Sequence, residues 1–174
     1  MAAHEPVQTT NLDGYGNKPL PWSRAWNRVE ADLPKMETAG FLATAGPDGR
    51  PHSTGIGALK VGDDIYFTSG PRTRKSRNLA SNPACTLSLR LEGMDLVLEG
   101  EATRVTDGAT VQRVARAYSE SGWPAEAEGD ALTAPFSAPS AGPPPWYLYR
   151  LAFDVAFGVA TAEPHGATRW RFER

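Results

Sequence analysis

Residues 41–89 read FLATAGPDGRPHSTGIGALKVGDDIYFTSGPRTRKSRNLASNPACTLSL, and this stretch decides the fold class. Short apolar or alternating runs are separated by compact turns such as Pro47-Asp48-Gly49 and Val61-Gly62-Asp63. We therefore expect strands over residues 41–45, 51–60, 64–69 and 85–91. We expect a helix over residues 71–81, because Pro71 suits a first turn and Ser69 is a candidate N-cap.

The flanking segments add further elements of both kinds. Apolar residues recur at helical spacing from Trp22 to Met36, so a helix is expected there, kinked or split at Pro34 and ended by Gly40. A strand is expected over residues 95–106, followed by a helix that Asp107 caps. The apolar face of that helix is formed by Val111, Val114, Ala115 and Tyr118.

The C-terminal third combines an irregular segment with the clearest strand. Residues 121–145 contain six prolines and no periodicity, which is typical of a functional or disordered loop. Strands are expected over 146–159 and 167–172, with the odd-numbered residues from Tyr147 to Val159 on one face. We divide the chain into a mobile or surface-draped arm, 1–20, and a single domain, 21–174, with a Pro-rich insertion at 121–145. Six or seven strands in hairpin order, with three helices, predict a mainly β (α+β) fold, an antiparallel β-barrel with peripheral helices.

Composition excludes several classes of protein. The 174 residues carry a net charge of −2, so no overall basic field favours a nucleic acid partner. One cysteine and three histidines provide neither a disulfide framework nor a metal cluster. Cys85 alternates along its strand with leucines expected in the core, which indicates that its side chain also packs in the core. We expect no membrane partner and a cytoplasmic location, because the sequence has no apolar run of 18 residues and a polar N-terminus.

The only dense group of cations lies at the start of the helix predicted over residues 71–81. It consists of Arg72, Arg74, Lys75 and Arg77. The N-terminus of a helix carries a partial positive charge, which disfavours cations and favours phosphate. A group of cations at that end therefore indicates an anion site, with a solvated basic turn as the simpler alternative.

The quoted stretch resembles the pyridoxamine-phosphate-oxidase-like, flavin-binding split β-barrel family. The likeness rests on the Pro-Asp-Gly-Arg-Pro-His turn, Lys-Ser-Arg-Asn-Leu at 75–79, the segment 98–102 and the segment 167–172. It covers roughly residues 20–120 and 146–172 and is closest to an actinobacterial branch that uses the deazaflavin coenzyme F420, or FMN. The Pro-rich segment and the arm depart from the family pattern.

The resemblance implies a set of cofactor-binding residues. Arg72, Arg74, Lys75, Ser76 and Arg77 would bind the cofactor phosphate, and in the deazaflavin case the carboxylates of its tail. His52, Ser53, Thr54 and Gly55 would lie under the ring, and Thr68 and Ser69 would reach the ring edge or the ribityl chain. Trp170 and Arg171 would lie beside the cofactor of a partner subunit, with barrel-edge packing as the alternative.

The leading hypothesis is an oxidoreductase that moves a hydride between coenzyme F420, or FMN, and a small conjugated organic acceptor. The extra arginines around Lys75 favour the deazaflavin. No side chain is expected to be indispensable, and His52 is the candidate proton donor. The alternative is a non-catalytic cofactor carrier or a haem-binding split barrel, for which His52 is the one plausibly placed ligand. We also expect the protein to form a homodimer. Trp123 and Phe136, in the Pro-rich segment, are expected either to cover a substrate pocket or to anchor the loop.

Overall fold

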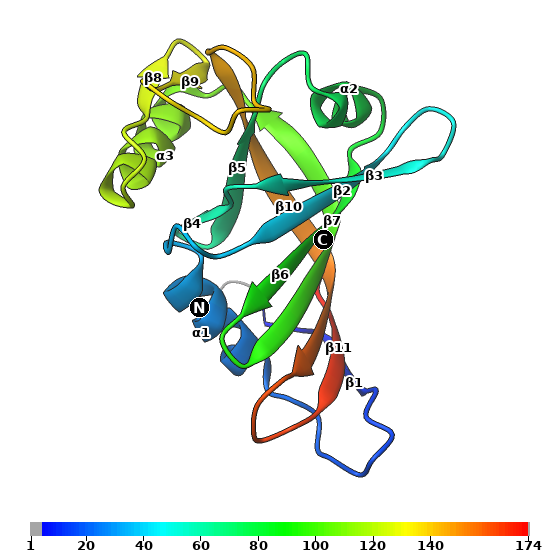
Figure 1. Cartoon of the computed structure of the whole chain (residues 1–174). Coiled ribbons are helices and arrows are strands. Elements are labelled where there is room, and N and C mark those ends of the chain that lie inside the picture. Colours follow the sequence, from blue (N-terminus) through cyan, green and yellow to red (C-terminus); the bar gives the residue numbers. More distant parts are fainter. Residues whose placement is uncertain (1–4, 174) are drawn as a thin grey trace.

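The computed structural model describes residues 5–173, in which antiparallel strands form one sheet and three helices lie around it (Figure 1). The helices are α1 (Trp22–Asp32), α2 (Arg74–Ser81) and α3 (Gly108–Glu120). The strands are β1 (Gln8–Asn11), β2 (Gly40–Ala45), β3 (Pro51–Ile56), β4 (Leu59–Val61), β5 (Asp64–Ser69), β6 (Ala84–Leu91), β7 (Met94–Val105), β8 (Glu126–Glu128), β9 (Ala131–Thr133), β10 (Trp146–Ala160) and β11 (Ala167–Arg171).

The sheet runs in the order β1-β11-β10-β7-β6-β2-β3 and does not close on itself. Strand β10 organises it, because it pairs with β7 along most of its length and with β5 and then β11 along its other edge. Strands β4 and β8–β9 extend the sheet from β5 and β10. The predicted split β-barrel class is confirmed. No helix among residues 5–173 has the length and apolar character to cross a membrane.

Two hydrophobic clusters lie on opposite sides of β5 and β10. The larger fills the barrel, where Trp22 of α1 packs against Trp170 and Phe172. The smaller lies under α3, whose predicted apolar face packs on Leu148 and Tyr66. Both faces of β5 are thus covered, and this positions the end of the strand firmly.

The structure corrects several predicted bounds. Helix α1 ends at Asp32, with Leu33 as its C-cap, because Pro34 has no N–H with which to continue the helical hydrogen bonds. The strand expected over 51–60 is two strands, β3 and β4, separated at Gly57. The arm contains an edge strand, β1, and the Pro-rich segment contains the short hairpin β8–β9, so the strands outnumber the six or seven predicted.

A β-bulge changes the predicted face of β10. The pairing of β10 with β7 shifts between Phe153 and Val155, so the alternation of faces reverses at that point. Beyond the bulge Ala156 is buried, whereas Val159 is 51% exposed. The residues from Tyr147 to Val159 therefore do not share one face.

Candidate functional site

The loop between β5 and α2 is held by a chain of hydroxyl hydrogen bonds. Thr73 is the N-cap of α2, with its Oγ1 accepting from the Ser76 backbone N–H at 3.4 Å and donating to the Gly70 carbonyl at 2.9 Å. The Ser76 hydroxyl donates to Ser69 Oγ at 2.7 Å, and both serines are buried. Helix α2 therefore begins three residues later than predicted from Pro71, and Thr73 rather than Ser69 caps it.

Four cations surround this helix start. Arg72, Arg74 and Arg77 are exposed, whereas Lys75 is partly buried. Within residues 5–173 none of the four forms an ion pair with a carboxylate, and the first turn of α2 holds no acidic residue. Burial lowers the pKa of Lys75, because its charged form is taken out of water without a counterion. The start of α2 therefore carries positive charge that no ion pair within residues 5–173 neutralises.

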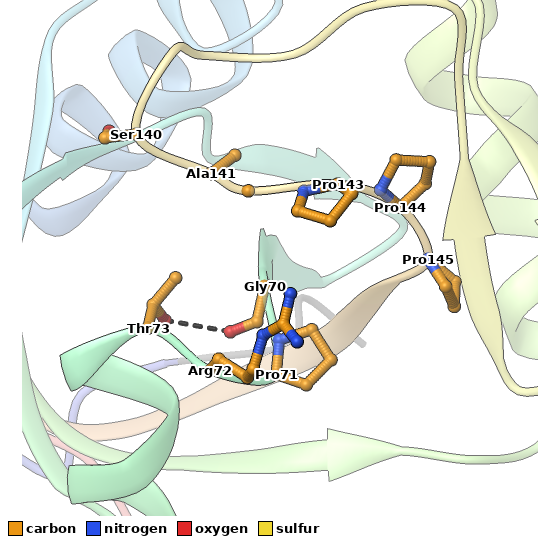
Figure 2. A pocket seen from close by; sticks show the side chains of 10 residues that line it. Gly70, Pro71, Arg72, Thr73, Ser140, Ala141, Pro143, Pro144 and Pro145 are labelled. Carbon is orange, nitrogen blue, oxygen red and sulfur yellow. Dashed lines mark hydrogen bonds between the residues drawn. The ribbon is translucent and has the colours of Figure 1, made fainter.

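Figure 2 shows a cleft of about 440 Å³ between the loop that leads into α2 and the Pro-rich segment 140–145. The Arg72 side chain extends into it, toward Pro143. The two walls are close together at Gly70, where a Cβ atom would lie under 3.0 Å from the Ala141 carbonyl oxygen. Glycine is therefore required here by the close approach of the Pro-rich backbone.

A second cleft lies on the other side of the start of α2. Arg74 and Arg77 line it together with the turn 46–48, and its volume is about 440 Å³. Asn78 holds this wall in place, because its buried amide donates to Thr44 Oγ1 of β2 at 3.0 Å. The arginines of the cluster thus line two clefts, of which the second also contains the Asp48 carboxylate, and they span more than one side of the start of α2.

The predicted residues of β3 divide between its two faces. Thr54 pairs with buried Leu42 and His52 with buried Thr44, so these side chains face the barrel side. Ser53 and Gly55 face outward, beside Ala43 and Phe41. Strand β3 is the last in the sheet order, so in the described part of the chain its outer edge offers unpaired main-chain groups.

The remaining predicted residues lie in different surroundings. Thr68 and Ser69 point to opposite faces of β5, and only Ser69 joins the hydroxyl chain. Strand β11, which carries Trp170 and Arg171, lies at the end of the molecule remote from α2 (Figure 1). Trp170 has no exposed surface and contacts Trp22, so its ring is not available to a ligand. Arg171 is exposed.

The other reactive residues have structural surroundings. Cys85 is a buried thiol whose pKa is raised to about 12, first by burial and then by the nearby charge of Glu101. Among residues 5–173 no three His, Cys, Asp or Glu side chains are grouped as a metal site. Neither feature offers a nucleophile or a metal centre.

One feature that the sequence pattern did not locate in full is an apolar cleft of about 380 Å³. Trp123 and Phe136 line it, as expected for a roof over a pocket. Its other walls come from the loop after α1 and from the bend between β3 and β4, around Met36 and Ala58. The signal available in the sequence was Met36, which continues the helical spacing beyond Pro34 and is 72% exposed in the structure.

Residues 29–140 match the protein-family model described as pyridoxamine 5'-phosphate oxidase. Because this match covers more than half of the 174 residues, the chain belongs to that family of flavin-binding oxidoreductases. A pyridoxine/pyridoxamine 5'-phosphate oxidase of Acidothermus cellulolyticus is 35% identical over 92 residues, which is 51% of this chain. The match spans 41% of that relative's length.

Solved structures with this fold come from several bacteria. A pyridoxamine 5'-phosphate oxidase-related, FMN binding protein of Nostoc punctiforme has a TM-score of 0.58 at 19% identity, covering 89% of this chain and 91% of its own. A conserved hypothetical protein of Mycobacterium tuberculosis has a TM-score of 0.61 at 18% identity, and the match covers 86% of this chain and 90% of that protein. PhzG of Burkholderia lata, in complex with tetrahydrophenazine-1-carboxylic acid, has a TM-score of 0.57 at 19% identity, and the match covers 92% of this chain and 89% of PhzG. At these identities the likeness concerns the fold.

Proposed function

We propose that this protein is an oxidoreductase whose flavin-type cofactor binds with its phosphate at the start of α2. The observation that carries the proposal is Lys75, a partly buried cation with no carboxylate partner among residues 5–173. A phosphate beside it would supply the missing counterion and would also accept from the free N–H groups of the first helical turn. The buried hydroxyls of Ser69 and Ser76 keep that turn in position.

We further propose that the cofactor is the deazaflavin coenzyme F420, with FMN as the alternative. FMN carries its negative charge on one phosphate, which Lys75 and the helix turn would satisfy. The arginines in the two flanking clefts extend the cationic surface beyond that point, on Arg72 to one side and Arg74 to the other. An acidic tail would use them, and this favours the deazaflavin.

The protein's own groups then have distinct roles. A bound flavin or deazaflavin supplies the hydride, so the chain has to bind, orient and shield. The open edge of β3 presents main-chain donors and acceptors that can hold the edge of a planar ring. His52 and Thr54, on the barrel side of β3, are the candidates to pass a proton to the reduced product.

We also propose a homodimer, formed on the outer face of the sheet. A single row across five strands carries Phe41 on β2, Ser88 on β6, Val97 on β7, Phe157 on β10 and Arg169 on β11. Phe41 is 52% exposed, and the other four residues of the row are partly buried. The neighbouring row contains Ser53 and Arg171, so a second copy placed on this face would bring Arg171 near the β3 of its partner.

Substitution of Lys75 tests the proposed phosphate site. Losing one charge-assisted hydrogen bond costs about 1.5–3 kcal/mol, so Lys75→Ala should raise the dissociation constant for the cofactor roughly tenfold to a hundredfold. Lys18→Ala is the matched control, because Lys18 is an exposed cation on the arm. Calorimetric titration with FMN and with coenzyme F420 measures both variants. An unchanged dissociation constant for both cofactors in Lys75→Ala would reject the assignment.

A further inference from the structure

The apolar cleft defined above lies on the α3 side of β5, across that strand from the Ser69–Ser76 hydroxyl pair. Thr68 links the cleft to the hydroxyl pair, because it lines the cleft and directly precedes Ser69 in β5. The end of α3, the loop after α1 and the Pro-rich segment complete the walls. Its volume of about 380 Å³ is within the range of small-molecule sites.

Aromatic side chains give the cleft a fixed wall. The Trp123 indole donates from Nε1 to the Phe136 carbonyl at 2.7 Å and packs edge-on against Tyr118, with ring centroids 5.1 Å apart. The side chain of Phe136 is 55% exposed although its backbone is held in this way. Together with Met36 it leaves apolar surface at the rim, and such patches often mark ligand sites.

The charges of the cleft are paired. Among residues 5–173 only one charged residue, Lys35, lines it, and the Lys35 ammonium is paired with buried Asp32 at 2.6 Å. The Tyr118 hydroxyl donates to the Gly57 carbonyl at 2.8 Å, and burial raises the pKa of this phenol, so it stays neutral. The Thr38 and Ser121 hydroxyls donate to the carbonyls of Asp32 and Ala117 at 2.6 Å and 2.8 Å. Thr68 and Ser137 add two further hydroxyls to the lining, which can hydrogen-bond a carbonyl oxygen.

We propose that the apolar cleft binds an uncharged, planar, conjugated carbonyl compound and does not accept pyridoxamine 5'-phosphate. A phosphate entering the cleft would lose its hydration without meeting an unpaired cation, which is strongly unfavourable. A flat apolar molecule would instead pack against Trp123 and Phe136. This inference rests on the proposed function and deepens it: the reduced cofactor would give two electrons and one proton as a hydride to a conjugated carbon, and His52, Thr54 or water would give the second proton.

Binding to the purified chain without cofactor tests this directly, with menadione as the neutral planar probe. The sole cysteine, Cys85, is buried, which protects the titration from addition of its thiol to the quinone. We expect saturable binding of one menadione per chain in calorimetry, with no displacement by pyridoxamine 5'-phosphate. Removing the exposed apolar rim by Phe136→Ala or Met36→Ala should weaken binding roughly threefold to tenfold. Tyr15→Ala removes an aromatic ring that is 96% exposed and outside the cleft, and should change nothing.

Three results would overturn the inference: no menadione binding, displacement of menadione by pyridoxamine 5'-phosphate, or equal affinity in both rim variants and the wild type. Titration of the same preparations with FMN and coenzyme F420 separates this inference from the proposed function. Cofactor binding without menadione binding rejects the cleft alone. Menadione binding that responds to the rim variants, without binding of either cofactor, supports the cleft and rejects the cofactor proposal.

Discussion

Replacing Gly70 by alanine tests whether the Pro-rich segment is packed over the loop that leads into α2. The new Cβ would lie under 3.0 Å from the Ala141 carbonyl oxygen and 3.2 Å from Thr73 Cγ2. The first of these neighbours is backbone, so relief requires the Pro-rich segment to move by on the order of 1 Å. Overpacking of this kind costs typically about 1–3 kcal/mol. For a chain of this size, that corresponds to a fall of about 2–12 °C in the unfolding midpoint.

The assay is thermal unfolding of Gly70→Ala beside Gly108→Ala. A Cβ at Gly108 meets nothing within 4 Å, and the residue is helical, so the control should be neutral or slightly stabilised. We also expect weaker cofactor binding in Gly70→Ala, because Arg72 and Thr73 share the loop that would move. If the midpoint of Gly70→Ala stays within about 1 °C of the wild type, the Pro-rich segment does not pack against Gly70 and the cleft in Figure 2 has a different shape.

Three other predictions concern Asp32, Cys85 and His52. The Asp32 carboxylate accepts hydrogen bonds from Arg28 at 2.8 Å, from Lys35 at 2.6 Å and from the Glu92 backbone N–H at 2.8 Å. Burial raises the pKa of Asp32, but these hydrogen bonds outweigh burial and hold the pKa below its ordinary value of 3.8. Asp32→Asn should therefore lower the free energy of unfolding by about 2–4 kcal/mol at pH 7 in denaturant titrations. The contribution of Asp32 is complete above pH 3.8 and is lost as the pH falls through its folded pKa, so the variant should show a flatter acid limb. Cys85 should resist iodoacetamide at pH 8 until the chain unfolds, since its thiol is buried with a pKa raised to about 12; rapid alkylation of the folded chain would contradict this. His52→Ala should lower single-turnover reduction of menadione by less than about a hundredfold, and a loss beyond about a thousandfold with intact cofactor affinity would make His52 a true general acid.

The proposed homodimer is tested by light scattering on the wild type at micromolar concentration. One species of twice the 18.7 kDa chain mass is expected, and a single 18.7 kDa species would contradict the proposal.

Local patterns in the sequence were sufficient to predict the strands with a strong alternation of apolar and polar residues and the helices with a clear N-cap. Strand β6 has Cys85, Leu87 and Leu89 on its buried face, as the alternating pattern predicts. Helix α3 begins after Asp107, whose carboxylate accepts from the Thr110 N–H at 2.8 Å. In both elements one face is apolar and the other polar, so local and tertiary preferences agree.

The bulge in β10 illustrates what the sequence could not show. Alternation of residue types continues through Phe153 and Val155, so nothing in the sequence marks the shift in the pairing of β10 with β7. The hairpin β8–β9 has strands of three residues, which are too short for a period to be recognised. These features depend on pairing partners that are distant in the chain.

The sequence predicted which cations lie at the start of α2, but it predicted only part of how the side chains of the candidate site are arranged. The group from Arg72 to Arg77 does surround the start of a helix, which Thr73 caps at its beginning and Asn82 at its end. The sequence did not indicate that Arg72 and Arg74 line different clefts or that His52 and Ser53 face opposite ways. Trp170 was misleading, since an aromatic residue near the C-terminus fits either a ligand site or a core, and it belongs to the core.

The most direct test of the phosphate site compares ligands that differ by a phosphate. FMN and riboflavin share the same ring and ribityl chain, so titrating the wild-type chain with both, and with coenzyme F420, isolates the contribution of the phosphate. We expect FMN or coenzyme F420 to bind at least about tenfold more tightly than riboflavin, and we expect this difference in affinity to shrink as salt is added. Riboflavin binding as tightly as both phosphate-bearing cofactors would contradict the assignment of Lys75 and the start of α2 as the phosphate site.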